Sequence, residues 1–389
     1  MALRRISILG STGSIGTQAL DIIRRHPDMF KVTALSAHHQ AEALFEQVRY
    51  FRPVMAGLTT GEVPVPQDLH FCQWHFGQQA LETLAAQAPC DDVLVSVVGM
   101  VGLGSVLAAR KAGRRVLLAN KEALVTGGQL VMDVCPEDTD NPSLIPVDSE
   151  HSAIWQCLMG AGGNPYERIL LTASGGPFRT WTREQMRQAR LEDALRHPNW
   201  QMGRKITVDS ATMFNKALEM VEARWLFNAK PSQIEVLIHP QSIVHSMVAF
   251  CDGAVMAQLG VPDMRAPIAF ALAYPCRVDN GTPPLRLDHL GTLSFEPPDE
   301  TRFPAIRLAR ETLTAGGAAA CIMNAANEIA VDAFLRGSIH YLDIASVVED
   351  SLLSLGNLPA DNLEQVAEAD RQARLMASQL IKRYTLEDL

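Results

Sequence analysis

Short apolar runs alternate with helical patterns along the first 147 residues of the chain. Four runs have the length and the β-branched content of buried strands, and they cover residues 6–9, 32–35, 93–98 and 116–119. The segments between them have helical spacing, as in residues 104–111, where the pattern stops before Gly113. This βαβ order predicts a doubly wound parallel sheet over residues 1–147.

The pattern changes after residue 147. Residues 148–280 mix helical stretches with strand-like runs at 234–238, 243–250 and 254–259, and the last two meet at Asp252-Gly253, a strong hairpin signal. We therefore expect a central α+β catalytic domain with a mostly antiparallel sheet. Five prolines and little periodicity predict a linker over 281–304, and helical spacing predicts an all-helical C-terminal domain over 305–389.

Composition narrows the classes of protein to consider. The chain has 389 residues and a formal net charge of −9, which disfavours a nucleic-acid-binding or membrane-binding protein, because both need a basic face. No apolar run reaches the roughly 18–20 residues that span a bilayer, and no signal or transit pattern precedes the first strand. The seven cysteines include no CxxC pair. We expect reduced, mostly buried thiols in a cytoplasmic protein.

Three glycines follow the first strand, at positions 10, 13 and 16, and a helical pattern begins there. Glycine lets the backbone approach a pyrophosphate, and a helix N-terminus stabilises its negative charge. The GxxGxxG spacing is one residue longer than the common GxGxxG fingerprint, and a plain strand-to-helix turn is the alternative. Inside a βαβ unit, the spacing predicts a Rossmann-like dinucleotide-binding domain.

The second strand ends Ser36-Ala37-His38-His39-Gln40, without an acid. An acid at this place usually bonds the ribose 2′-hydroxyl of NAD. A carboxylate would repel a 2′-phosphate, whereas His38 and His39 could accept one, so the sequence favours NADP. The alternative is that both histidines are solvated loop residues.

Asp148-Ser149-Glu150 follows the apolar run 144–147. If the segment stays extended, residues two apart point to the same side and both carboxylates face one cleft. Oxygen ligands without Cys or His suit Mg²⁺ or Mn²⁺. The alternative is a helix N-cap with an acid in the first turn.

The stretch 209–219 has the features of a capped helix start. Asn215 and Lys216 lie four and three residues before Glu219, so the three share one helix face. Ser210, near the predicted N-terminus, can bind an anion with help from the helix dipole. One helix could therefore hold a phosphate and give a carboxylate to a metal. A surface Lys–Glu pair is the alternative.

Two loops are unusual in composition. Residues 172–178 form a donor-rich loop after a strand at 169–171, and residues 197–203 place Trp200 between a proline and a glycine, as a closing lid would. An ordinary packed loop with a buried Trp200 is the alternative.

Taken together, several segments resemble the 1-deoxy-D-xylulose 5-phosphate reductoisomerase family. They are GSTGSIG (10–16), LLANKE (117–122), PVDSEH (146–151), SGGPF (174–178), HPNWQMGRKI (197–206), VDSATMFNK (208–216), IHPQSIVHSMV (238–248) and NAANE (324–328). The resemblance covers nearly the whole chain, and HPNWQMGRKI with PVDSEH is its most specific part.

The resemblance implies an oxidoreductase/isomerase that uses NADPH and a divalent metal. It would convert 1-deoxy-D-xylulose 5-phosphate to 2-C-methyl-D-erythritol 4-phosphate in the non-mevalonate isoprenoid pathway. By the family's pattern, the metal ligands would be Asp148, Glu150 and Glu219. Together with Lys121, these three would be the catalytic residues. The substrate would contact Lys121, Ser149, Glu150, Ser174, His197, Trp200, Ser210, Asn215, Lys216 and Glu219. NADPH would contact Thr12, Gly13, Ser14, Ile15, Ala37, His38, His39, Gln40, Asn120, Glu122 and Gly203.

Residues 38–40 depart from the family pattern, which commonly has a small residue, a basic residue and then Asn. Two rival functions stay open: another NADP-dependent sugar-phosphate dehydrogenase, and a dinucleotide sensor without enzymatic activity. The strands at 234–259 would bury one face of a sheet and offer an edge to a second subunit, so we expect a homodimer.

Overall fold

The computed structural model describes residues 3–136, 141–196, 200, 203–356 and 358–384. The chain divides into two compact units, each built from separate stretches of sequence. One unit comprises residues 1–123, 131–152 and 263–283, and the other comprises residues 124–130, 153–262 and 284–389. The sequence predicted continuous domains instead, with boundaries at 147, 280 and 304. The helix at 265–273, described below, accounts for one part of the difference, because it places residues 263–283 in the first unit.

The first unit is built on a seven-stranded sheet in the order β4-β3-β2-β1-β5-β6-β7, with every pairing parallel. Its strands are β1 (Arg4–Leu9), β2 (Phe30–Ala37), β3 (Met55–Leu58), β4 (Gln73–Phe76), β5 (Asp92–Val95), β6 (Arg115–Leu118) and β7 (Leu144–Pro146). The predicted strand at 93–98 is too long, since β5 ends at Val95 and Val98 is exposed.

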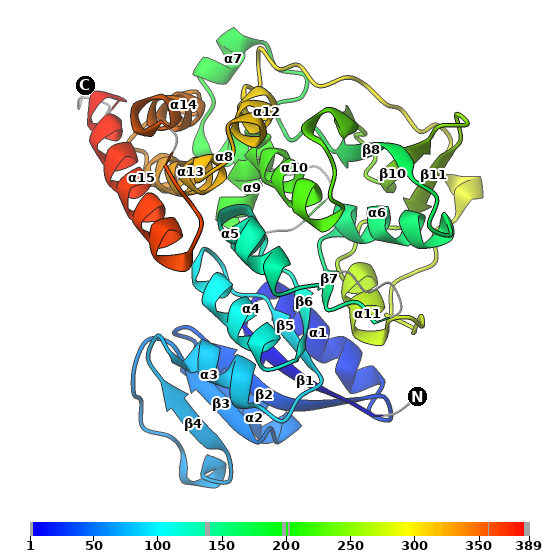
Figure 1. Cartoon of the computed structure of the whole chain (residues 1–389), viewed down its shortest axis with the longest axis vertical. Helices are drawn as coiled ribbons and strands as arrows, with labels where there is room; N and C mark the ends of the chain where they lie inside the picture. The colour runs from blue at the N-terminus through cyan, green and yellow to red at the C-terminus, as the bar shows by residue number, and fades with distance from the viewer. Residues whose placement is uncertain (1–2, 137–140, 197–199, 201–202, 357, 385–389) are drawn as a thin grey trace. The chain divides into compact units, whose positions relative to one another are not determined.

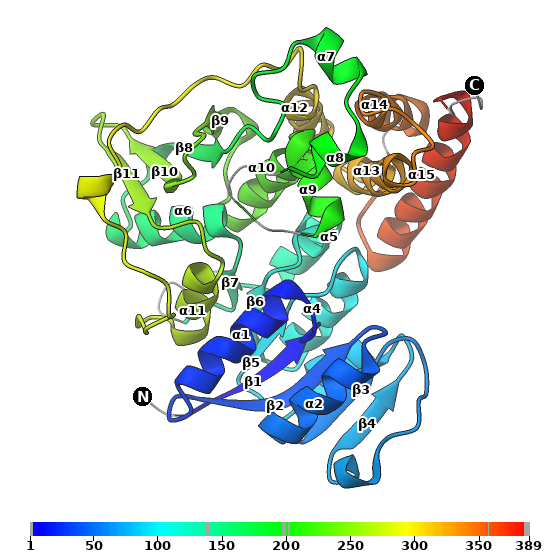
Figure 2. The ribbon, with the colours of Figure 1, turned by 180° about the vertical axis from the view of Figure 1, so that it is seen from behind.

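Helices cover both faces of this sheet. They are α1 (Ser14–Arg25), α2 (Ala41–Phe51), α3 (Ala80–Gln87), α4 (Val101–Lys111) and α11 (Arg265–Ala273). Figures 1 and 2 show α3 and α4 on one face and α1 and α2 on the other. Ile6, Ile8 and Leu9 of β1 therefore have no exposed area. The doubly wound, Rossmann-like fold predicted from the sequence is confirmed.

Helix α11 belongs to this unit although it follows the central domain in sequence. It packs against α1, and the Arg4 guanidinium donates to the carbonyls of Leu272 and Tyr274 at 3.0 and 2.5 Å. Seven of the nine α11 residues are buried. The local sequence pattern could not reveal that these residues return to the first sheet, because the contact depends on the tertiary structure.

The second unit contains a four-stranded sheet in the order β11-β10-β8-β9. Its strands are β8 (Tyr166–Ala173), β9 (Ile234–Ile238), β10 (Val244–Phe250) and β11 (Val255–Leu259). β8 pairs with β9 in parallel, whereas the other two pairings are antiparallel. The mostly antiparallel sheet is thus confirmed, as is the hairpin, where Phe250 N–H donates to the Ala254 carbonyl at 2.9 Å.

Helices make up the rest of the second unit. They are α7 (Arg183–Arg187), α8 (Leu191–Ala194), α9 (Arg204–Ala211), α10 (Phe214–Leu226), α12 (Ala305–Ala315), α13 (Ala319–Leu335), α14 (Asp343–Leu355) and α15 (Leu363–Tyr384). Helices α5 (Lys121–Asp133) and α6 (Ser149–Gly160) run through residues of both units. Helices α13, α14 and α15 pack on one another, which confirms the helical C-terminal region (Figure 1).

The segment predicted as a linker is attached to the second sheet. The backbones of Ile238 and Glu296 exchange hydrogen bonds of 2.8 and 2.9 Å. All seven cysteines are free thiols, and Cys251 and Cys276 are the exposed ones. Among the described residues, no helix combines the length and the apolar character that crossing a bilayer requires.

Candidate active site

The glycine loop leaves the carboxyl end of β1, beside β5. The chain connects away from these two neighbouring strands in opposite directions, which is where doubly wound sheets bind nucleotides. Gly10 has φ of +86°, and a Cβ there would lie 2.8 Å from the Ser96 carbonyl oxygen. A Cβ on Gly16 would lie 2.4 Å from the Gly10 carbonyl oxygen. Both glycines are therefore required by backbone packing.

The third glycine has a different environment. Gly13 is exposed and is the N-cap residue of α1. Ser14 is also exposed, and Thr12 and Ile15 are partly exposed. The predicted cofactor residues 12–15 thus surround an accessible helix N-terminus, which can bind a phosphate group through its free N–H groups.

Residues 37–40 form the turn between β2 and α2. Ala37 is buried, whereas His38, His39 and Gln40 are exposed. His38 Nδ1 lies 2.6 Å from Thr59 Oγ1, and the two histidine rings are 5.2 Å apart. Exposure agrees both with a 2′-phosphate contact and with a solvated loop, so the role of these histidines stays a prediction.

Asn120 is buried and holds the ends of two strands together. Its amide donates to the carbonyls of Val97 and Gly99 at 2.8 and 3.0 Å, and to Glu122 at 3.0 Å. Its side-chain oxygen accepts from Ala123 N–H at 3.0 Å, which caps α5. Asn120 therefore ties the segment after β5 to the start of α5, and the contacts of Asn120 and Glu122 with the cofactor stay a prediction.

Asp148 caps helix α6, and the expected extended conformation of residues 148–150 is wrong. Its carboxylate accepts the backbone N–H groups of Glu150 and His151 at 3.0 and 3.3 Å. These are among the donors that a helix start leaves unpaired, so an aspartate here favours the helix. Residues 148–150 therefore form a helix N-cap with Glu150 in the first turn, and their role as metal ligands stays a prediction.

Lys121 and His151 face the Asp148 carboxylate. Lys121 Nζ donates to Oδ2, and His151 Nδ1 lies 3.2 Å from Oδ1. Burial alone would raise the pKa of Asp148, but Lys121 and His151 hold it well below its usual range. The carboxylate is therefore ionised at neutral pH. Ser149 Oγ donates to Glu150 at 2.6 Å beside it.

His151 is a residue that the sequence interpretation missed. It is fully buried and contacts Asp148 directly. Its only signal in the sequence was its place in the segment PVDSEH, since a lone histidine on a helix is more often part of a core.

A sharp break separates α9 from α10. Met213 has φ of +65°, and its N–H bonds the Ser210 carbonyl at 3.2 Å. Ser210 consequently lies in the last turn of α9, so the expectation that it lies near a helix N-terminus is wrong. Asn215 and Lys216 are the residues in the first turn of α10.

Glu219 lies at the centre of the predicted phosphate and metal face of α10. Asn215 Nδ2 donates to Glu219 Oε1 at 2.6 Å, and Lys216 Nζ donates to Oε2. The shared helix face is confirmed. Lys216 is 4% exposed and Glu219 is 0% exposed, so the alternative of a surface pair is wrong.

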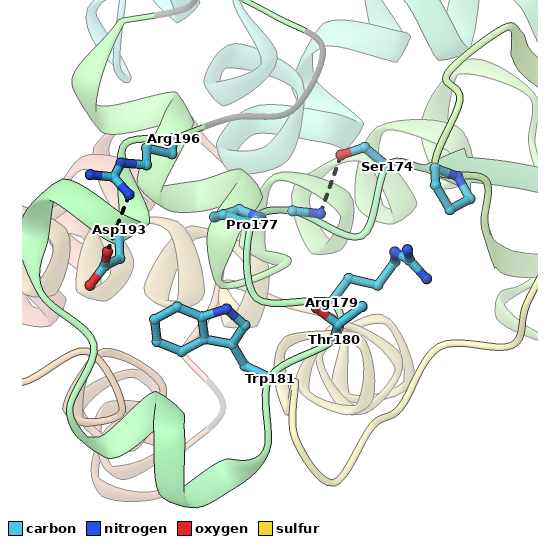
Figure 3. Close-up of a pocket in the computed structure, with 9 residues that line it drawn as sticks. Ser174, Pro177, Arg179, Thr180, Trp181, Asp193 and Arg196 are labelled. Carbon is cyan, nitrogen blue, oxygen red and sulfur yellow. Dashed lines mark hydrogen bonds and ion pairs between the residues drawn. The ribbon is translucent and has the colours of Figure 1, made fainter.

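The loop after β8 lies directly against the end of α9. Ser174 Oγ accepts from Gly176 N–H at 3.2 Å, as Figure 3 shows. A Cβ on Gly176 would lie 2.7 Å from the Ser210 carbonyl oxygen. The second unit thus brings together the Ser174 loop and the Ser210 segment, which are far apart in sequence.

A cavity of about 380 Å³ opens beside this loop (Figure 3). The Ser174–Trp181 loop forms one wall, and Asp193, Arg196 and Pro240 complete the lining. One guanidinium nitrogen of Arg196 lies 4.0 Å from Asp193 Oδ1. The cavity therefore has a polar, partly cationic rim next to Ser174.

The predicted lid is only partly described. His197, Pro198, Asn199, Gln201 and Met202 lie outside the described residues. The Trp200 ring is half-buried, 6.3 Å from the ring of His245, and Gly203 is the exposed N-cap residue of α9. The lid stays a prediction.

Comparisons with known proteins cover nearly the whole chain. Family models match residues 6–128 ("1-deoxy-D-xylulose 5-phosphate reductoisomerase"), residues 144–227 ("1-deoxy-D-xylulose 5-phosphate reductoisomerase C-terminal domain") and residues 259–376 ("DXP reductoisomerase C-terminal domain"). The chain belongs to the 1-deoxy-D-xylulose 5-phosphate reductoisomerase family. Every segment that carried the resemblance from residue 10 to residue 216 lies within the first two matched ranges.

Relatives that carry this family name are similar along their full length. The reductoisomerase of Ralstonia nicotianae is 51% identical over 97% of this chain and 98% of its own. That of Cupriavidus necator is 51% identical over 96% of each chain. Among solved structures, the Zymomonas mobilis reductoisomerase in complex with NADPH has a TM-score of 0.89 and 39% identity, over 98% of this chain and 99% of that one. A reductoisomerase in complex with NADPH, fosmidomycin and magnesium has a TM-score of 0.88 and 38% identity, over 98% of both.

Proposed function

We propose that this protein converts 1-deoxy-D-xylulose 5-phosphate to 2-C-methyl-D-erythritol 4-phosphate, using NADPH and a divalent metal ion. This reaction is an early step of the non-mevalonate route to isoprenoids. The observation that carries the proposal is the family match across residues 6–128, 144–227 and 259–376. These ranges contain the glycine loop, both acidic segments and the Ser174 loop.

NADPH fits the first unit. The backbone packs closely at Gly10 and Gly16, where no side chain would fit. The exposed N-terminus of α1 can bind the pyrophosphate. We propose that residues 12–15 contact the cofactor phosphates and that His38 or His39 contacts the 2′-phosphate. We also propose Asn120, Glu122 and Gly203 as further contacts. A solved relative in complex with NADPH supports this assignment.

A hard divalent cation fits the carboxylates. We propose that Asp148, Glu150 and Glu219 bind Mg²⁺ or Mn²⁺ together, as all three offer oxygen ligands. Asp148 is held ionised by Lys121 and His151, and Glu219 accepts from Lys216 and Asn215. In the absence of a cation, Lys121 balances the charge of Asp148, and Lys216 balances that of Glu219. Lys121 and Lys216 lie beside these carboxylates, where each could also donate to substrate oxygens.

The substrate phosphate fits the segments around α9 and α10. We propose that Ser174, Ser210, Asn215 and Lys216 bind it, with His197 from the lid. Hydroxyl, amide and ammonium groups together supply both the hydrogen bonds and the positive charge that a phosphate requires. Gly176 lies close to the Ser210 backbone in the second unit. This contact supports the proposal that Ser174 and Ser210 bind the same phosphate.

The bound cation supplies Lewis-acid polarisation of the substrate's ketone and hydroxyl oxygens, and NADPH supplies the hydride. The chain's own residues orient the substrate between these groups. Lys121 and Ser149 would hold the oxygens near the metal, and the phosphate residues would fix the other end of the sugar. A lid around Trp200 would exclude water from the intermediate aldehyde.

We also propose that the protein is a cytoplasmic homodimer. Strand β11 is the edge of its sheet, and Val255 on that strand is 51% exposed. An open strand edge with an apolar side chain favours pairing with another chain. Light scattering at micromolar concentration should give twice the mass of 42.5 kDa, and a monomeric mass would contradict the dimer.

The decisive experiment is an assay of NADPH oxidation with the ketose phosphate, with and without Mg²⁺, followed by analysis of the product. Branched 2-C-methyl-D-erythritol 4-phosphate is expected only when the metal is present. A product with an unbranched carbon skeleton would favour the alternative of an ordinary sugar-phosphate dehydrogenase. Absence of metal-dependent turnover would contradict the proposed function.

A further inference from the structure

Tyr341 lies at the point where two proposed phosphate-binding segments meet. It belongs to the turn between α13 and α14, far in sequence from both segments, and it is 3% exposed. Its hydroxyl donates to the Ala211 carbonyl at 2.7 Å. Its ring packs against the Phe178 ring, with the centroids 4.6 Å apart. One side chain therefore contacts both the end of α9 and the loop after β8.

The hydrogen bond to Ala211 fixes the residue next to Ser210. Ala211 is the last residue of α9, and the carbonyls of a last helical turn have no partner within the helix. The Tyr341 hydroxyl supplies that partner. Burial raises the pKa of Tyr341, so the hydroxyl stays neutral and remains a donor. The break at Met213, with φ of +65°, follows directly.

The ring contact fixes the loop of Ser174. Phe178 has no exposed area and lies between Tyr341 and Trp181, with ring centroids 4.6 and 4.8 Å away. Trp181 is labelled in Figure 3, where it ends the loop that begins at Ser174. Because Gly176 also abuts the Ser210 backbone, this loop and the end of α9 form one packed unit with Tyr341 behind them.

A second contact from the helical region acts on the same helix. Asn327 of α13 donates to Asp209 Oδ1 at 2.7 Å, and Lys205 pairs with the other Asp209 oxygen at 2.9 Å. Asp209 is 1% exposed. Residues before and after Ser210 are thus both bonded to the region 319–341, which itself holds none of the proposed ligands.

We propose that Tyr341 is a positioning residue for phosphate recognition, which holds the Ser174 loop and the end of α9 at the separation that the substrate phosphate requires. This inference rests on the proposed function, in which Ser174 and Ser210 bind that phosphate. The C-terminal helical region would then contribute to substrate affinity through the hydroxyl and the ring of Tyr341.

The test is Tyr341→Phe, compared with Tyr166→Phe in otherwise identical protein. Tyr166 is a matched control, because its hydroxyl also donates to a backbone carbonyl of the same unit, that of Phe227 at 2.8 Å, away from the phosphate segments. Both variants should lose similar stability to urea. Tyr341→Phe should raise the KM for the ketose phosphate roughly three- to tenfold, the effect of one hydrogen bond, with kcat and the KM for NADPH unchanged.

Inorganic phosphate, used as a competitive inhibitor, separates phosphate binding from the rest of the site. Its inhibition constant should rise by the same factor in Tyr341→Phe and stay constant in Tyr166→Phe. Equal KM and inhibition constants in the two variants would overturn the inference while leaving the proposed function intact. An inactive wild-type enzyme would instead overturn the proposed function.

A second variant keeps the test decisive if Tyr341→Phe folds poorly. Phe178→Leu keeps an apolar side chain and removes most of the ring contact with Tyr341. It should weaken inhibition by phosphate to a similar degree, without changing the KM for NADPH. Unchanged inhibition by phosphate in folded Phe178→Leu would also overturn the inference.

Discussion

The start of α6 and the start of α10 each hold a carboxylate beside a lysine, but they do so in different ways. At α6, Asp148 pairs with Lys121, which lies 27 positions earlier on another element. At α10, Glu219 pairs with Lys216, three positions earlier on the same helix. The first pair exists only when the sheet of the first unit is formed, whereas the second is built into one turn of helix.

The two pairs also differ in exposure and in their other partners. Asp148 is 15% exposed and Lys121 13%, while Glu219 is 0% and Lys216 4%. Asp148 receives two backbone N–H groups as a helix cap. Glu219 receives side-chain donors. A fully buried pair loses more hydration than a pair that is 13–15% exposed, so each partner at α10 depends more strongly on the other.

The largest expected effect tests what the two carboxylates share. Glu219→Gln and Asp148→Asn should each lower kcat roughly a thousandfold, because a metal's Lewis-acid stabilisation is worth several kcal/mol. NADPH binding, followed by fluorescence titration, should stay unchanged. Turnover should be measured over a range of Mg²⁺ concentrations. Wild-type activity of either variant at limiting Mg²⁺ would remove that residue from the proposed metal site.

The next effect tests how the two pairs differ. In metal-free urea unfolding, Glu219→Gln should lower the free energy of unfolding by about 3–5 kcal/mol, because it removes the carboxylate that pairs with the buried Lys216 ammonium. Asp148→Asn should lower the free energy of unfolding by less, since Lys121 is more exposed than Lys216 and can be partly solvated.

The control for that comparison is a double variant. Adding Lys216→Met to Glu219→Gln removes the buried ammonium as well as the carboxylate, and it should recover part of the lost stability but no activity. If Glu219→Gln proves no less stable than Asp148→Asn, the distinction between the two helix starts does not hold.

The same distinction explains what the sequence could predict. Asn215, Lys216 and Glu219 interact within one helical turn, so their spacing predicted the shared face correctly. Sequence spacing did not predict their burial, because the packing around α10 decides it. The alternating apolar runs likewise predicted the doubly wound sheet, whose strands β1, β2, β5 and β6 have local signals.

Features that depend on distant contacts were missed or wrong. The extended conformation expected at Asp148 is wrong because the carboxylate caps α6, as the alternative interpretation of the same residues predicts. Ser210 was assigned to a helix start because nothing in the sequence marks the break at Met213. The bond from Tyr341 to Ala211 spans 130 positions, and no pattern of spacing in a single sequence can reveal it.

The smallest expected effect isolates the cap at α6 from the charge of Asp148. An asparagine can accept the same backbone N–H groups of Glu150 and His151, whereas an alanine cannot. Asp148→Ala should therefore be less stable than Asp148→Asn by about 1 kcal/mol in metal-free urea unfolding. Both variants should be equally inactive, since neither offers a carboxylate to the metal.

The corresponding pair at α10 should behave differently, which makes it the control. Glu219 caps no helix, so Glu219→Ala and Glu219→Gln differ only in the bonds that a glutamine amide can keep with Asn215 and Lys216. Both leave the ammonium of Lys216 without its carboxylate, and that shared loss should dominate. Equal stability of Asp148→Ala and Asp148→Asn would mean that the cap adds nothing at α6.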